Sequence, residues 1–171
     1  EAFSVKTGDV DSMEWFSMFR LKWSDKEAAL LLETIDKCKI TFGTYFSFKE
    51  IYSVIDSMED YDKDIKFALK NRFKVADSWG LFSKEGTSVR DMAKPGWVNI
   101  IDVSTYGSVL GMENIREIVV AILGKRLFEE REMERKVEEI TLIESGEKKS
   151  GLPMIWMLID EAHMFMPNDR P

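Results

Sequence analysis

Asp160 and Glu161 are adjacent acids placed directly after an apolar run, residues 153–159. A run this short, with Gly151 and Pro153 at its start, is typical of a buried strand in a parallel sheet. Ligands of such sheets bind beyond the carboxyl ends of the strands, where both acids would lie. Because strand side chains alternate, the two carboxylates would point to different sides and could take different tasks.

The chemistry that suits such a pair is hydrolysis of a magnesium nucleotide. Asp160 suits an oxygen ligand of Mg²⁺, held directly or through a bound water. Glu161 suits the base that orients and deprotonates the water attacking the terminal phosphate. The alternative is structural, because acids are favoured at helix N-termini and the pair could simply cap a following helix. The apolar run before the pair and Ala162-His163 after it favour the catalytic interpretation.

His163 is the only histidine of the chain, and it could sense the terminal phosphate or be an ordinary polar residue. A zinc site is disfavoured, because no second His or Cys lies at zinc-ligand spacing. Further candidates for lining the nucleotide site are Asp102, Ser104 and Arg170. Each has an ordinary alternative, since Asp and Ser are common at strand ends and a lone Arg is common on surfaces.

The elements that would position these residues form a strand–helix–strand unit. A turn at Lys94-Pro95-Gly96 precedes a β-rich strand over 97–103, and a long helix is predicted from about 112 to 140. Together with the strand before Asp160, they form a βαβ unit with parallel strands and a right-handed crossover. The predicted fold class is therefore α/β, with residues 91–171 as half of a sheet. The charged second half of the long helix is interpreted as a solvated face with i, i+4 pairs, not as a DNA-binding stripe.

Residues 1–90 are predicted to form a separate, mostly helical lobe. Capping boxes at Ser24–Glu27 and Ser47–Glu50 begin two helices, and a third runs from about 62 to 79. A short helix starts near Asp11. Apolar residues at helical spacing give the predicted core: Ala28, Leu31, Leu32, Ile35, Cys38, Ile51, Tyr52, Ile55, Met58, Ile65, Leu69, Val75, Ala76 and Trp79. The aromatic residues Trp15, Phe16, Phe19 and Trp23 are assigned to the core rather than to a base-stacking platform.

The amino-acid composition limits the classes of fold and function that the chain can have. The 171 residues, 44% of them hydrophobic and including five Trp and eleven Phe, are enough for a real core and for one or two domains. A net charge of −7 disfavours a wholly basic nucleic-acid-binding surface. The single cysteine, Cys38, excludes an internal disulfide and indicates a cytosolic, cytoplasmic context. No apolar stretch nears the roughly 18 residues of a membrane span, so no membrane partner is expected.

Two segments resemble the archaeal HerA-type ATPases. Residues 153–167, an apolar strand followed by Asp-Glu-Ala-His, an aromatic residue and a proline, are similar to the Walker B region of that family. Residues 94–104, a Pro-Gly turn and a strand that ends Asp-Val-Ser, are similar to the segment before it. The helical region is similar in kind to the family's inserted helical lobe. The specific resemblance covers about a quarter of the chain.

The resemblance implies a partial RecA-like P-loop NTPase sheet over residues 91–171, preceded by the helical lobe of residues 1–90. It implies that the chain is a fragment of an ATP-hydrolysing DNA translocase or helicase with ATP and Mg²⁺ as cofactors. It also implies a homo-oligomer, a hexameric ring on double-stranded DNA, that works with a nuclease partner. Asp160 would take the magnesium role and Glu161 the role of catalytic base. The chain departs from the family in one respect, because it contains no Gly-x-x-x-x-Gly-Lys-Ser/Thr loop. We expect that loop before residue 1, and we expect this chain alone to be inactive.

Two other interpretations stay open at this point. Asp-Glu-Ala-His is shared with the DEAH-box helicases, although the long helical stretch before the strand and the Phe165/Pro167 continuation favour the HerA type. The third interpretation is a non-catalytic module whose helical lobe binds a protein partner. A phosphate-binding loop elsewhere in the intact gene product would decide between catalysis and the last of these.

Overall fold

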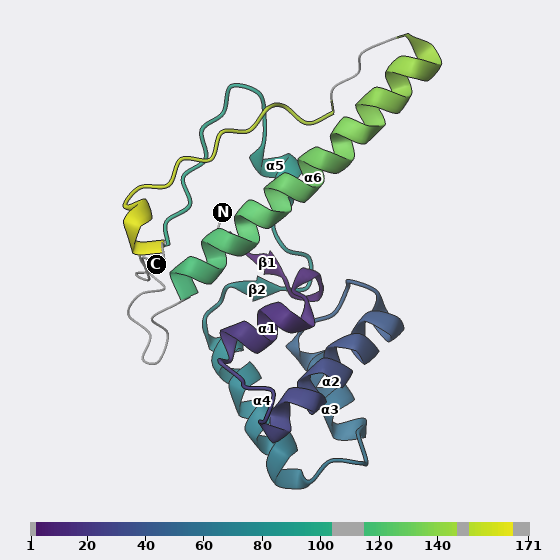
Figure 1. Cartoon of the computed structure of the whole chain (residues 1–171), viewed down its shortest axis with the longest axis vertical. Helices are drawn as coiled ribbons and strands as arrows, with labels where there is room; N and C mark the ends of the chain where they lie inside the picture. Colours follow the sequence, from purple (N-terminus) through teal and green to yellow (C-terminus); the bar gives the residue numbers. More distant parts are fainter. Residues whose placement is uncertain (1–2, 104–114, 147–150, 166–171) are drawn as a thin grey trace. The chain divides into compact units, whose positions relative to one another are not determined.

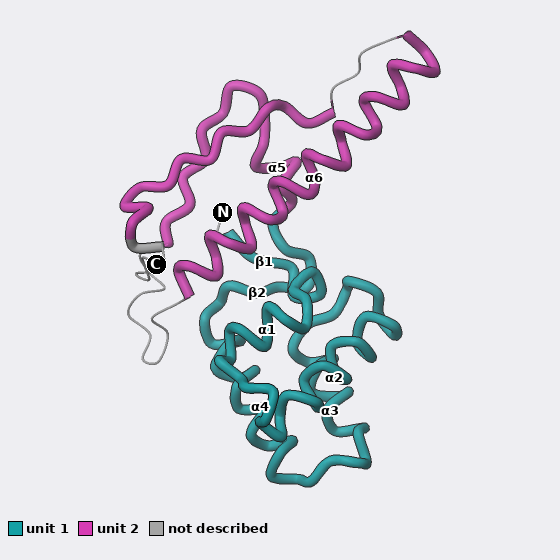
Figure 2. Tube along the Cα trace, viewed as in Figure 1, with its two compact units in different colours: residues 1–87 teal, residues 88–171 magenta. Residues whose placement is uncertain are grey.

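The computed structural model of the chain describes residues 3–103, 115–146 and 151–165. The chain divides into two compact units, residues 1–87 and 88–171 (Figure 2). The sequence analysis placed the boundary at 90/91. Among the described residues, no helix is both long enough and apolar enough to span a membrane.

The first unit is a four-helix assembly closed by a very small sheet (Figure 1). Its elements are β1 (Val5–Lys6), the 3-10 turn η1 (Thr7–Asp9), α1 (Ser12–Met18), α2 (Lys26–Phe42), α3 (Phe48–Ser57), α4 (Lys63–Ser78) and β2 (Phe82–Ser83). Helix α2 packs against α1, α3 and α4, and α3 also packs against α4. The bundle that the helical spacing predicts is therefore present.

Helix starts in this unit follow local side-chain chemistry. Asp11 and Glu14 form a capping box at α1, and Ser47 and Glu50 form the predicted one at α3. The capping box predicted at Ser24 is wrong. Helix α2 begins one residue later, with Asp25 as its N-cap, and the Asp25 side chain accepts from the backbone N–H of Lys22 at 2.8 Å instead.

Trp15 is the centre of the core of this unit. Its ring is fully buried and lies against Phe19, Phe48, Phe73 and Phe82, with ring centroids 4.9–5.9 Å apart. Tilted and edge-on contacts of this kind add to the stabilisation that burial itself provides. Phe19 directly follows α1 and the other three rings come from α3, α4 and β2, so the cluster joins elements that lie far apart in the sequence.

Strands β1 and β2 pair in parallel, with Val5 opposite Phe82 and Lys6 opposite Ser83. Side chains extend the join, because the Thr7 hydroxyl donates to the Ser83 carbonyl at 3.1 Å and the Ser4 N–H donates to Thr87 Oγ1 at 2.9 Å. The pair connects the start of the chain to the segment after α4. The unit therefore closes on itself with only two strand residues on each side.

The second unit contains α5 (Val89–Met92), α6 (Ile115–Ser145) and the 3-10 turn η3 (Ala162–Phe165). Helix α5 packs on α6, and Arg90 pairs with Glu134 across that contact. The first turns of α6 bury four apolar side chains: Ile115, Val119, Ile122 and Leu123. Its second half is exposed and carries the expected i, i+4 ion pairs: Lys136–Glu132 and Arg135–Glu139.

The predicted fold class, an α/β fold with a partial RecA-like sheet of parallel strands, is wrong for this chain. The described residues are mostly helical, and the one sheet among them is the two-stranded β1–β2 pair. Residues 97–103 and 153–159 have no strand assignment, although the sequence predicts strands there. The physical reason is that an apolar run becomes a strand only when a neighbouring strand forms hydrogen bonds with its backbone N–H and C=O groups. No such ladder forms in the described part of either segment.

Candidate functional site

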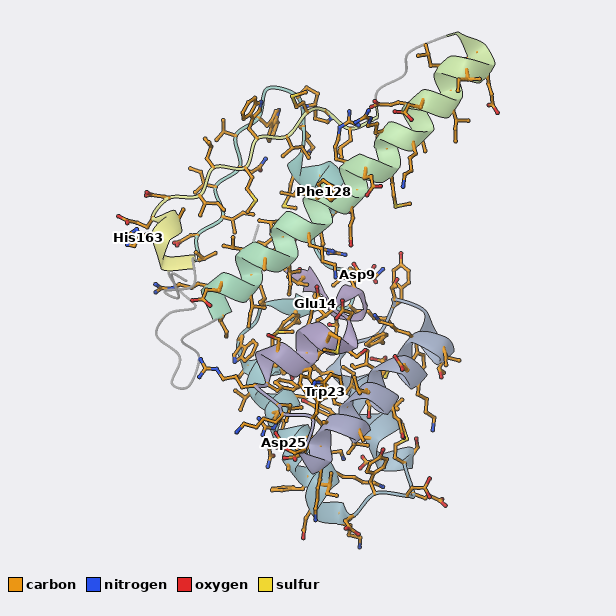
Figure 3. The ribbon with its side chains drawn as sticks, in the orientation of Figure 1. Asp9, Glu14, Trp23, Asp25, Phe128 and His163 are labelled. Carbon is orange, nitrogen blue, oxygen red and sulfur yellow. The ribbon has the colours of Figure 1, made fainter. Side chains whose placement is uncertain are left out.

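Asp160 and Glu161 form a turn between the non-helical segment 153–159 and η3. Both acids are exposed, as is His163, which Figure 3 shows on η3. The structure thus brings the three residues of the predicted site together within one turn of chain. It does so without the sheet that was expected to hold them.

The backbone of Glu161 is strained. Its φ is +51°, in the left-handed region that costs an L-residue about 1–2 kcal/mol. Arg20, with φ +49°, has the same conformation for an ordinary reason, since it follows α1 and its N–H donates to Ser17 O at 3.0 Å. That is the usual left-handed end of a helix. Glu161 does not follow a helix, and unexplained left-handed residues gather at functional sites.

Two contacts hold this turn. The Glu161 N–H donates to Asp160 Oδ1 at 2.9 Å, and His163 Nδ1 lies 3.1 Å from Glu161 Oε2. The second contact orients the Glu161 carboxylate toward the imidazole.

The metal-binding capacity of this turn is limited. No group of three or more His, Cys, Asp or Glu side chains suited to a metal ion occurs among the described residues. Mg²⁺ demands near-octahedral oxygen coordination, but it commonly takes only one or two carboxylates plus water and substrate phosphates. Asp160 fits the role of one such carboxylate. The described residues do not offer an all-protein cage for the ion.

The other sequence candidates are placed as follows. Asp102 is exposed in the non-helical segment after α5. Ser104 and Arg170 lie outside the described residues, so the structure does not bear on them. The arginines and lysines of the second half of α6 are engaged in pairs such as Arg131–Glu138 at 3.0 Å, which agrees with a solvated face.

Cys38 is fully buried in α2, and burial raises the pKa of its thiol to about 11. A thiol that stays protonated at neutral pH is a poor nucleophile. The interpretation of Cys38 as a packed core residue is confirmed.

One surface feature was missed by the sequence analysis. A groove of about 480 Å³ lies between the first turns of α2 and α4, and it is lined by Lys26, Glu27, Asp62, Lys63, Asp64, Ile65 and Ala68. Its lining carries two cations and three acids, so it favours neither an anion nor a cation. The sequence gives one sign of this groove: the first turns of α2 and α4 are both charged.

No protein-family model matches this chain, and neither a curated protein nor a solved structure does. The class of the protein is therefore argued from its own residues.

Proposed function

We propose that this chain belongs to an ATP-hydrolysing DNA translocase or helicase of the HerA type, and that Asp160, Glu161 and His163 form its Walker B element. The observation that carries the proposal is the order of residues at 153–163: six apolar side chains after Pro153, then Asp-Glu-Ala-His. The exposure of both acids and the left-handed backbone of Glu161 support it.

Each residue has a role in the proposed reaction. Asp160 would hold Mg²⁺ directly or through a bound water, and the ion would supply positive charge to the nucleotide phosphates. Glu161 orients the attacking water and accepts its proton. His163 holds Glu161 in its resting orientation through the 3.1 Å contact. ATP and Mg²⁺ are thus the proposed cofactors.

Hydrolysis also needs a phosphate-binding loop, which these 171 residues do not contain. In the proposal this loop is supplied from outside these 171 residues, and the protein forms a homo-oligomeric hexameric ring around double-stranded DNA. A nuclease partner and a cytoplasmic location belong to the same proposal. The chain by itself should bind Mg-ATP weakly, since nothing in it cradles the phosphates.

The test measures ATP turnover by the full-length protein, with and without double-stranded DNA. Glu161→Gln should lower turnover by at least about 100-fold, the range for loss of a general base, while ATP binding is retained. Asp160→Asn should lower turnover and raise the Mg²⁺ concentration that half-maximal turnover requires. Glu144→Gln, an exposed acid at the end of α6, is the matched control and should change nothing. Turnover that Glu161→Gln leaves intact would remove the base role, and wild-type protein without DNA-stimulated turnover would reject the motor.

A further inference from the structure

Trp23 is an exposed aromatic residue on the connection between α1 and α2, where Figure 3 labels it. Its side chain is 70% exposed, and one face of the indole rests on Phe16, with ring centroids 4.8 Å apart and planes 35° apart. The sequence analysis assigned Trp23 to the core rather than to a base-stacking platform, and the core assignment is wrong for this residue. The side of the indole away from Phe16 is open to another planar group.

Hydrogen bonds fix the backbone on both sides of Trp23. The Lys22 N–H donates to Asp25 Oδ2 at 2.8 Å, and the Asp25 N–H donates back to the Lys22 carbonyl at 2.9 Å. Just before them, the buried Leu21 donates its N–H to the Phe16 carbonyl at 3.1 Å. A ring that is already held in place loses little conformational freedom when a ligand binds. Trp23 is therefore preorganised for a stacking contact.

Exposed cations flank this ring, although the chain as a whole is acidic. Residues 15–24 contain no acid, and Arg20, Lys22 and Lys26 all lie within three residues of Trp23. Each of the three side chains is exposed. Three residues of extended chain span at most about 11 Å, so all three cations lie close to the ring. The surface around Trp23 therefore combines an open ring with positive charge.

Acids limit this surface on one side. Lys26 lines the groove between α2 and α4 together with Glu27, Asp62 and Asp64. Lys22 is not among the residues that line the groove. A negatively charged ligand at Trp23 is therefore expected to contact Lys22 and to avoid the groove.

Two other exposed rings already hold a cation. Lys6 Nζ lies 3.4 Å from the ring centroid of Tyr45, so that cation covers the ring. Lys94 Nζ lies 5.2 Å from the ring centroid of Trp97, in the same arrangement. At Trp23 the partner ring covers one face, and the lysines flank the residue in the chain. Trp23 is thus better suited to stack with a ligand.

We propose that the Trp23 platform, defined as Trp23 with Arg20 and Lys22, binds single-stranded DNA. An unpaired base stacks on the open face of the indole, and the two cations contact the neighbouring phosphates. A base inside a duplex cannot do this, because both of its faces are stacked on other bases. The choice of DNA over RNA rests on the proposed function: the platform takes the unpaired strand that a helicase exposes, while the duplex stays with the ring.

Fluorescence anisotropy of a labelled thymine oligonucleotide measures binding to the 171-residue chain. We expect a Kd of about 1–100 μM at physiological salt, the range of contacts that do not read sequence. Trp23→Ala should raise the Kd by about 5- to 150-fold, the effect of losing one stacked base. Trp23→Phe keeps a ring and should raise the Kd less than Trp23→Ala does. Phe67→Ala removes a similarly exposed ring of α4 and is the control that should leave the Kd unchanged.

Salt dependence separates stacking from charge. For single strands, the slope of the logarithm of the binding constant against the logarithm of the salt concentration is about −0.7 for each neutralised phosphate. Lys22→Gln should therefore make the slope shallower by about 0.7. Trp23→Ala should weaken binding and leave the slope unchanged. Lys63→Gln, which changes a lysine of the groove, is the matched control and should alter neither quantity.

Three results would overturn the proposal. The first is no binding by the wild-type chain at about 100 μM protein, the weak limit of the expected range. The second is a Kd that Trp23→Ala leaves unchanged in a variant whose circular dichroism shows it to be folded. The third is a duplex of the same length that binds as tightly as the single strand, because charge alone would then explain the contact.

Two further comparisons separate this proposal from its neighbours. A uridine oligonucleotide that binds more tightly than the thymine one would overturn the assignment to DNA. ATP turnover by the full-length protein tests the proposed function independently of the platform. Single-strand binding without turnover would keep the platform and reject the motor, whereas turnover without single-strand binding would do the reverse.

Discussion

Replacing Trp15 tests how the core of the first unit is stabilised. The ring is fully buried among four Phe rings, so Trp15→Ala should lower the free energy of unfolding by about 3–5 kcal/mol. Trp15→Phe should behave differently, because the indole Nε1–H has no hydrogen-bond partner among the described residues. A buried donor without a partner costs about 1–3 kcal/mol, and Phe removes that donor.

The two effects of Trp15→Phe nearly cancel. The smaller ring leaves a void of roughly 40 Å³ and buries less apolar area, which together cost about 2 kcal/mol. Removal of the unpartnered N–H raises the free energy of unfolding by about the same amount. The expected change in the free energy of unfolding is therefore within about 1 kcal/mol of zero, far below that of Trp15→Ala.

The assay is urea denaturation followed by circular dichroism at 222 nm, with the midpoint and the slope both measured. Trp23→Phe is the control, because Trp23 is 70% exposed and its replacement should leave the midpoint unchanged. A Trp15→Phe variant that loses more than about 3 kcal/mol would refute the reasoning, since the donor would then be contributing rather than costing stability.

The remaining predictions concern glycine and cysteine. Gly8→Ala should lower the free energy of unfolding by more than about 2 kcal/mol, because the new Cβ would lie 2.1 Å from the Thr44 carbonyl oxygen. Gly124→Ala in α6 should raise it by about 0.5–1 kcal/mol, because only Met157 Sδ lies near the new Cβ. Changes of the opposite signs in urea denaturation would contradict the packing at these two positions. Burial raises the Cys38 thiol pKa from 9.0 to about 11, so the folded state keeps a proton that the unfolded state releases. The free energy of unfolding is unaffected by this thiol below pH 9 and should fall by up to about 2 kcal/mol between pH 9 and 11. Cys38→Ala should remove this loss. A difference in stability between the two proteins that does not change with pH would exclude the explanation.

Helix positions in the first unit could be predicted because each depends on nearby residues. The Ser47–Glu50 capping box and the apolar spacing behind it define α3 without reference to the rest of the chain. Burial within those helices was less predictable. Val75 was expected in the core and is exposed, whereas Phe73, two residues earlier, is fully buried against Trp15. The choice between them depends on the angle at which α4 meets α1, which spacing alone does not contain.

Exposed aromatic residues show the same limit. Trp23 was assigned to the core, but it follows the end of α1 and rests only one face on Phe16, with ring centroids 4.8 Å apart. Hydrophobicity indicates that a side chain gains from burial, not that the fold supplies a place for it. A large fraction of any protein surface is apolar for this reason.

The sheet was the largest error, and its cause is the non-local nature of strands. A helix satisfies its own backbone within four residues, whereas a strand depends on partners elsewhere. The sequence of 153–159 predicts a buried strand, and that prediction is wrong, because the sequence contains no information on which segment would pair with it. Residues 97–103 meet the same difficulty, since apolar residues such as Val98 and Ile100 stay exposed in the structure.

The backbone of Glu161 departs from what local stability favours. A residue at φ +51° outside a helix end would be Gly or Asn if stability alone decided, because either adopts that backbone at lower cost. Here a Glu stands there, supported by the 2.9 Å bond from its N–H to Asp160 and by the nearby imidazole of His163. A local rule is thus broken at Glu161, and the catalytic role of its carboxylate stays a prediction that the turnover experiment tests. The turn formed by residues 160–163 is held by its own short-range contacts, and the predicted parallel sheet is absent from the described residues.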